Sequence, residues 1–166
     1  NVGKTVEKRD IKLFKITDIN SKEQNKKNIL ITVGQHSPME MLGGHFLVPI
    51  IEYFKKYPEI LKKIVLYFIP IVNVDCAHWG GNGENVNRMN TNRCWFRNLQ
   101  PETIGIRNYF KKLQKQGINL HFFMDIHSGG TFRNHQITRY PDIFYKKMFH
   151  NNASELIQKK RHALKL

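Results

Sequence analysis

Three short apolar runs, each bounded by glycine or polar residues, most strongly constrain the fold of this 166-residue chain. They are NILITVG (28–34), IVLYFIPIVN (64–73) and NLHFFMDI (119–126). Runs of this length are typical of buried β-strands. Helical patterns separate them, from Pro38 to about Tyr57 and over residues 101–117, where a proline opens the segment and a glycine closes it. The alternation of strands and helices predicts an α/β fold with an at least partly parallel sheet.

Weaker patterns predict the remaining elements. IKLFKIT (11–17) alternates apolar and polar residues, which is typical of a half-buried strand. The Gly- and Asn-rich stretch from Val74 to about Leu99 predicts a long loop, and residues 142–164 predict a basic helix. We expect Pro49 to kink the helix that begins at Pro38, since proline removes an intrahelical hydrogen bond.

Composition excludes several classes of protein. The apolar share of 40% and the charged share of 24% are those of a globular domain with a real core. The net charge of +14 comes mostly from dispersed lysines, and no stretch interleaves aromatic and basic residues, so a nucleic-acid partner is not expected. No apolar run approaches the roughly 18 residues of a membrane span, so no membrane partner is expected either. The two cysteines, Cys76 and Cys94, predict reduced thiols and a cytoplasmic location.

Polar residues follow each of the three apolar runs. His36 comes just after the first run, Asn73 to Asp75 after the second, and His127 after the third. In open α/β sheets, ligands bind at the carboxyl ends of the strands. We therefore expect these residues to lie close together and to form a site.

The stretch GQHSPMEM (34–41) has two interpretations. Ser37, Pro38 and Glu40 fit the start of a capped helix, in which Ser37 is the N-cap and Glu40 the third residue of a capping box. This interpretation leaves His36 unexplained. In the other interpretation, His36 and Glu40 are two ligands of a metal. The stretch by itself leaves both open.

A metal site would need a third ligand, and His127 is the candidate. Catalytic zinc is commonly held by two histidines and one carboxylate. Asp125 lies two residues before His127, so on a strand it shares the same side of the sheet and could orient the imidazole. In the loop that follows the second run, Arg93 stands beside Asn92 and could bind a carboxylate through two parallel hydrogen bonds.

The order of these motifs resembles the zinc metallocarboxypeptidases, most closely their cytosolic branch. The motifs are a strand followed by His36 and Glu40, IPIVNVDC with its Asn-x-Asp, TNRCWF with its Asn-Arg, and DIHS with His127. The resemblance extends to about Ser128 and implies a three-layer α/β/α sandwich with a mixed, largely parallel sheet. It implies one zinc ion per chain, bound by His36, Glu40 and His127. It also implies that Asn92 and Arg93 hold the C-terminal carboxylate of a peptide or protein substrate, possibly an acidic one.

Three features depart from the family pattern. The spacing His36-x-x-x-Glu40 is one residue longer than the family's His-x-x-Glu, although both spacings share one face of a helix. The arginine that stabilises the oxyanion would fall near Gly83, and Arg88 is the nearest substitute. The general-base glutamate lies much further along the family's chain, whereas the acids after His127 here are Asp142 and Glu155. We therefore expect residues 1–166 to form a single, partial catalytic domain that binds zinc with little or no peptidase activity.

Two alternative functions stay open at this point. Zinc deacylases of the aspartoacylase kind share a similar His/Glu/His plan and an Asn-Arg carboxylate anchor. A non-catalytic pseudoenzyme would instead bind acidic protein tails through Arg93 and the lysine-rich surface. Salt-sensitive binding of acidic peptides that persists with a chelator present would favour the pseudoenzyme.

Overall fold

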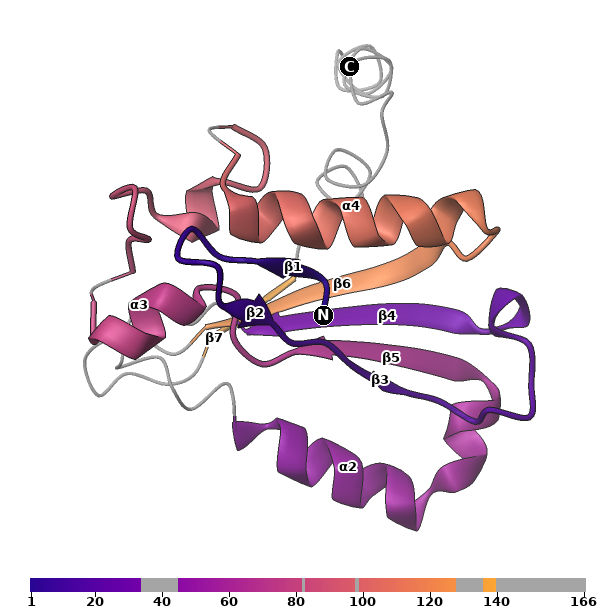
Figure 1. Cartoon of the computed structure of the whole chain (residues 1–166). Coiled ribbons are helices and arrows are strands. Elements are labelled where there is room, and N and C mark those ends of the chain that lie inside the picture. Colours follow the sequence, from indigo (N-terminus) through magenta and orange to yellow (C-terminus); the bar gives the residue numbers. More distant parts are fainter. Residues whose placement is uncertain (34–44, 82, 98, 128–135, 140–166) are drawn as a thin grey trace, which may run out of the picture.

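A computed structural model describes residues 1–33, 45–81, 83–97, 99–127 and 136–139 (Figure 1). His36 and Glu40, the glycines at 43 and 44, and the predicted basic helix over 142–164 lie outside the described residues. Within these described ranges, no helix has both the length and the apolar character needed to cross a membrane.

A five-stranded mixed sheet forms the centre of the structure, with the order β3-β5-β4-β6-β7 (Figure 1). Strand β4 lies between β5 and β6 and is parallel to both, whereas β3 and β7 pair antiparallel at the two edges. The strands are β3 (Phe14–Ile16), β4 (Lys27–Val33), β5 (Ile64–Ile69), β6 (Leu120–His127) and β7 (Gln136–Arg139). The three predicted apolar strands thus form the parallel centre of the sheet.

Helices cover both faces of this sheet. Helix α4 (Pro101–Lys115) lies on one face together with a hairpin of β1 (Gly3–Lys4) and β2 (Asp10–Ile11), and α2 (Leu47–Lys56) lies on the other (Figure 1). The shorter elements are α3 (Val74–Trp79) and the 3-10 helices η1 (Glu23–Asn25), η3 (Pro58–Lys62) and η4 (Thr91–Arg93). The predicted three-layer α/β/α sandwich with a mixed sheet is therefore confirmed.

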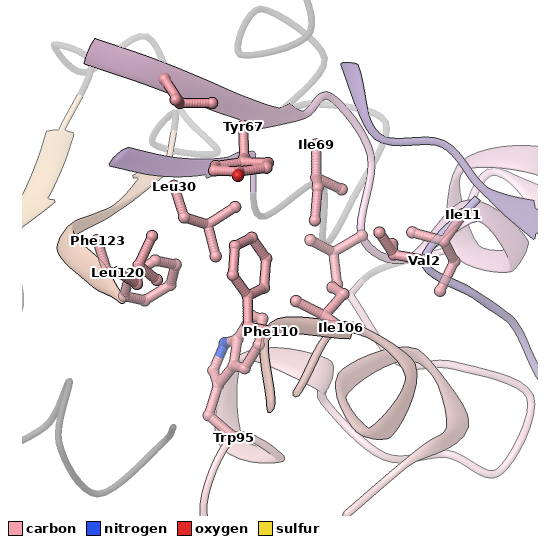
Figure 2. Packing of buried hydrophobic residues seen from close by; sticks show 12 residues of the cluster. Val2, Ile11, Leu30, Tyr67, Ile69, Trp95, Ile106, Phe110, Leu120 and Phe123 are labelled. Carbon is pink, nitrogen blue, oxygen red and sulfur yellow. The ribbon is translucent and has the colours of Figure 1, made fainter. Parts of the chain in front are cut away.

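The main core lies between the sheet and α4. Tyr67 of β5 packs edge-on against Phe110 of α4, with 5.3 Å between ring centroids, and Trp95 packs in the same way against Phe123 of β6 at 5.7 Å (Figure 2). The other members of this buried cluster are Val2, Ile11, Leu30, Val65, Ile69, Val72, Ile106 and Leu120. Burial of this much apolar surface is the main stabilising contribution to the fold.

Packing on the α2 face is looser. The buried cluster there consists of Val33, Phe68 and Ile126, with partly buried neighbours that include Ile50 of α2. None of the residues in α2 is fully buried. An open apolar groove of about 460 Å³ runs between α2 and the sheet and is lined by residues such as Tyr53 and Met124. Helix α4 therefore anchors its side of the sheet more tightly than α2 does.

A close backbone contact fixes the hairpin on α4. A Cβ atom on Gly105 would lie 2.8 Å from the Cα atom of Gly3 and 2.9 Å from the carbonyl oxygen of Val2. A glycine inside a helix costs about 1 kcal/mol relative to alanine. Glycine is required at position 105 despite this cost, because the hairpin backbone occupies the space that a side chain would need.

Two features of the described fold differ from the predictions. The single strand predicted over residues 11–17 is wrong, because Ile11 belongs to the hairpin whereas Phe14–Ile16 pairs with β5 in the main sheet. Pro49 lies in the first turn of α2, and the predicted start of this helix at Pro38 lies outside the described residues, so the kink stays a prediction. Strand β7 lies in a segment for which no helix or strand is predicted from the sequence.

Candidate functional site

The carboxyl ends of the three central strands meet at one edge of the sheet, because β4, β5 and β6 run in the same direction. Helix α3 and the loop that follows it lie at this edge (Figure 1). His127 is the last residue of β6, and Asn73 follows the end of β5. The sequence places His36 and Glu40 just after β4, but these two residues lie outside the described ranges, so their positions stay a prediction.

Asp125 and His127 are in direct contact at the end of β6. The Nε2 atom of His127 lies 3.0 Å from the Oδ2 atom of Asp125. An ionised carboxylate can only accept hydrogen bonds, so this contact requires the proton of the neutral imidazole to be on Nε2. The Asp125 side chain is 1% exposed and that of His127 is 14% exposed. Strand alternation predicts this pairing, since residues two apart share one side of a sheet.

Asp125 also binds a residue that sequence analysis missed. The hydroxyl of Thr32, on the neighbouring strand β4, donates to Oδ1 of Asp125 over 2.7 Å. The two residues are directly paired in the parallel register of β4 and β6. No local sequence pattern reveals this bond, because it depends on a register between strands more than 90 positions apart.

The contact of His127 with Asp125 is of a kind that orients histidines in metal sites. Histidines that bind metals usually donate their second ring N–H to a carboxylate or carbonyl, which fixes the tautomer. His127 has this arrangement, because Asp125 engages its Nε2 atom. Within the part of the chain that the structure describes, no group of three or more His, Cys, Asp or Glu side chains could hold a metal. Ligands from outside the described ranges would therefore be needed.

The predicted substrate-binding residues, Asn92 and Arg93, and the predicted oxyanion-stabilising Arg88 lie on the segment after α3. Arg93 is exposed at the end of η4, and the Asn90 side chain caps this short helix by accepting from the Asn92 N–H over 3.0 Å. Arg88 is exposed and has a left-handed backbone with φ of 57°. A buried amide holds its turn, because Oδ1 of Asn85 accepts from the Met89 N–H. Both guanidinium groups are thus displayed to solvent by fixed backbone turns.

The stretch from Val74 to Leu99 is not an irregular loop, which corrects the prediction. It contains α3, whose N-terminus is capped by the Asn73 side chain accepting from the Cys76 N–H over 3.2 Å. Gly80 ends α3 with a left-handed φ of 71°. An asparagine N-cap and a glycine after the last turn are ordinary helix signals, so the sequence did carry this information. Cys76 and Cys94 are both buried and form no disulfide.

The acidic residue of the Asn-x-Asp motif has a structural role. Buried Asp75 accepts from the Thr5 hydroxyl over 2.7 Å, from the Glu7 N–H over 3.0 Å and from the Arg9 guanidinium over 2.7 Å. Arg9 also pairs with Glu7, which in turn accepts from the Trp79 indole N–H over 2.7 Å. These bonds fasten the turn of the β1–β2 hairpin to α3, so Asp75 links two segments about 70 residues apart.

A second buried carboxylate, Glu102 of α4, binds the same part of the molecule. Its Oε2 atom accepts from the Asn85 amide over 3.2 Å, and its Oε1 atom lies 3.4 Å from the Val6 N–H. Glu102 therefore connects the hairpin turn to the loop that carries Arg88. No sequence pattern predicts this role, because a glutamate in the first turn of a helix is normally exposed.

Electrostatics make the hairpin attachment sensitive to pH. Burial by itself raises the pKa of the Asp75 carboxyl, but the hydrogen bonds from Thr5, Glu7 and Arg9 outweigh it and hold the pKa below its usual range. Hydrogen bonds from Lys4 and Asn1 lower the pKa of Asp10 to about 2. Because both values lie below those of the unfolded chain, both groups stabilise the fold above about pH 4. This stability is lost as the pH falls through the folded-state pKa.

We expect the urea midpoint of the wild-type chain to fall between pH 6 and pH 3 by more than that of Asp75→Asn. The variant has no carboxyl group to protonate at this position, so its stability should be lower at pH 6 but should depend less on pH. Urea unfolding at the two pH values, followed by tryptophan fluorescence, measures the change in midpoint for each protein. An equal fall in both proteins would contradict the role of Asp75.

The family match agrees with this architecture. A family model described as "Zinc carboxypeptidase" matches residues 1–96, which is more than half of the chain. The chain therefore belongs to the zinc carboxypeptidase family, and the resemblance found in the sequence is confirmed at the level of the family. No curated protein sequence matches the chain.

Solved structures of metallocarboxypeptidases share the fold. A metallo-carboxypeptidase from Burkholderia cenocepacia superimposes with a TM-score of 0.64 at 20% identity, over 78% of this chain and 35% of its own. A putative carboxypeptidase A from Shewanella denitrificans superimposes with a TM-score of 0.64 at 24% identity, over 78% of this chain and 34% of its own. A metallo-carboxypeptidase from Pseudomonas aeruginosa, in complex with (2-guanidinoethylmercapto)succinic acid, gives 0.62 at 25%, with coverages of 77% and 34%. The present chain thus spans about a third of the length of these relatives.

Proposed function

We propose that this chain forms part of a zinc-dependent metallocarboxypeptidase, a hydrolase that removes C-terminal residues from peptides or proteins. The observation that carries the proposal is the contact of His127 with Asp125 at the carboxyl end of β6, in a chain that belongs to the zinc carboxypeptidase family. One zinc ion per chain would be held by His36, Glu40 and His127. Zinc bound there would polarise the scissile carbonyl and activate a water molecule.

The chain's own residues would position the substrate. Arg93 and Asn92 would bind its terminal carboxylate, because a planar guanidinium matches a carboxylate with two parallel hydrogen bonds. The relative from Pseudomonas aeruginosa, solved with a ligand that contains succinic acid, supports recognition of a carboxylate. Arg88, exposed on its fixed turn, would stabilise the negative charge that develops on the carbonyl oxygen.

The proton-transfer residue is not assigned within this chain. A general base must reach the attacking water through a hydrogen bond. The acids that follow His127 are Asp142 and Glu155, and both lie in a lysine-rich stretch. We therefore propose that residues 1–166 bind zinc and the substrate carboxylate with little or no turnover. Measurable release of C-terminal amino acids by this chain would show that the assignment of the base is wrong.

We expect the zinc-loaded chain to bind a peptide with a free C-terminal carboxylate about 10- to 100-fold more tightly than the same peptide with a C-terminal amide, since hydrogen bonds between charged groups contribute about 1.5–3 kcal/mol. Arg93→Ala should abolish this preference. Titration of both peptides, with fluorescence anisotropy as the signal, measures the ratio of the two affinities.

Arg97→Ala is the matched control, because Arg97 is an exposed arginine on the same loop. This variant should keep the preference for the free carboxylate. Equal binding of acid and amide by the wild-type chain, or equal loss in the two arginine variants, would contradict the role of Arg93 in carboxylate recognition.

A further inference from the structure

Thr32, Asp125 and His127 form a continuous chain of hydrogen bonds across β4 and β6. Thr32 donates to Oδ1 of Asp125 over 2.7 Å, and Oδ2 of Asp125 faces Nε2 of His127 over 3.0 Å. Thr32 is fully buried and Asp125 nearly so. The two carboxylate oxygens are thus each engaged by a different neighbour, so the carboxylate plane is fixed from both sides.

We infer that Thr32 is a positioning residue for His127, acting through Asp125. A carboxylate held only by His127 could rotate about its terminal torsion, which has a broad energy profile. The Thr32 hydroxyl removes this freedom, so Oδ2 points at a constant position and selects the Nε2–H tautomer of the imidazole. The Nδ1 atom is then presented in a constant direction at the end of β6. The inference rests on the proposed function where it takes His127 to be a zinc ligand.

A catalytic role for the Thr32 hydroxyl itself is excluded by its burial. A nucleophilic hydroxyl must reach the reacting atom of a substrate as well as a general base. The Thr32 hydroxyl is bonded to the carboxylate, and it is fully buried, where no substrate can reach it. The alternative to positioning is a purely structural tie between two strands, which would affect stability without affecting the imidazole.

The chain offers a matched control for this alternative. Thr5 is also buried, and its hydroxyl also donates over 2.7 Å to a buried aspartate, Asp75. That aspartate binds Arg9 and a backbone N–H, with no histidine in the network. Thr5→Val therefore removes a comparable bond to an aspartate, together with the bond that the Thr5 hydroxyl accepts from the Arg9 N–H over 3.0 Å, and should lower stability alone.

The test compares Thr32→Val, Thr32→Ser and Thr5→Val in the full chain. Zinc affinity is measured by competition with a chromogenic chelator. The tautomer of His127 is measured in the metal-free chain, at one fixed pH, from the ¹⁵N chemical shifts of its ring nitrogens. These signals are assigned to His127 because they are absent from the spectrum of His127→Gln. Thr32→Val should weaken zinc binding about 10- to 100-fold, as other losses of outer hydrogen bonds to metal ligands do. It should also give mixed tautomers.

Thr32→Ser keeps the hydroxyl and should show the zinc affinity and the His127 tautomer of the wild-type chain. Thr5→Val should also show both, but with a lower stability. Wild-type values in Thr32→Val would overturn the inference, as would a wild-type His127 that is not mainly the Nε2–H tautomer. A wild-type chain that binds no zinc would contradict the proposed function, while the tautomers would still test Thr32. If Thr32→Val does not fold, Thr32→Ala gives the same two measurements.

Discussion

Asp75→Ala is expected to lower the free energy of unfolding by about 2–4 kcal/mol, a large part of the 5–15 kcal/mol typical of a whole domain. The substitution leaves the Thr5 hydroxyl, the Glu7 N–H and the Arg9 guanidinium without their shared acceptor. Since Thr5 is buried, its donor cannot be fully rehydrated without opening the hairpin. Urea unfolding followed by tryptophan fluorescence reports on this region directly, because Trp79 belongs to the same network.

Asp10→Ala is the matched control in the same hairpin. Asp10 pairs with Lys4 over 2.7 Å, but both side chains are substantially exposed and water replaces the lost bond. We expect a much smaller change in the urea midpoint for Asp10→Ala than for Asp75→Ala. Similar midpoints for the two variants would show that the buried network contributes no more than a surface ion pair, and that other contacts, such as those of Ile11 and Gly105, hold the hairpin.

The elements that the sequence predicted well are those set by local patterns. Strands β4, β5 and β6 follow continuous apolar runs, and α4 lies between a proline at its first position and a glycine just after its end. The strand predicted over residues 11–17 failed for a different reason. Its alternating pattern is local, but its hydrogen-bond partners come from two separate sheets, and no local pattern encodes that exchange of partners.

The same distinction applies to the site. The contact of Asp125 with His127 follows from the period of a strand, because the two residues are two positions apart on β6. The partners Thr32 and Thr5 lie 93 and 70 positions from their aspartates. Their contacts depend on the parallel register and on where α3 meets the hairpin. Sequence analysis therefore identified the acidic residues but not the hydroxyls that hold them.

The second large effect concerns the proposed zinc ligands. We expect about one zinc ion per chain in the wild-type protein and a loss of zinc affinity of at least 100-fold in His36→Ala and His127→Ala, because each removes one of three protein ligands. His121→Ala is the control. His121 lies at the opposite end of β6, where its Nδ1 accepts from the Asn28 N–H over 3.0 Å, so this variant should keep its zinc. Elemental analysis of the purified chains after dialysis gives the stoichiometry.

Glu40→Gln separates the two interpretations of GQHSPMEM. Glutamine serves the capping box as well as glutamate does, so the variant preserves a helix start at Ser37. It removes the ionised carboxylate that zinc would need, so we expect zinc to be lost while the stability of the metal-free chain is unchanged. Retention of zinc in Glu40→Gln, together with its loss in His127→Ala, would assign Glu40 to the cap. The zinc site would then need a different carboxylate. The extra residue between His36 and Glu40 would explain why Glu40 does not bind the metal.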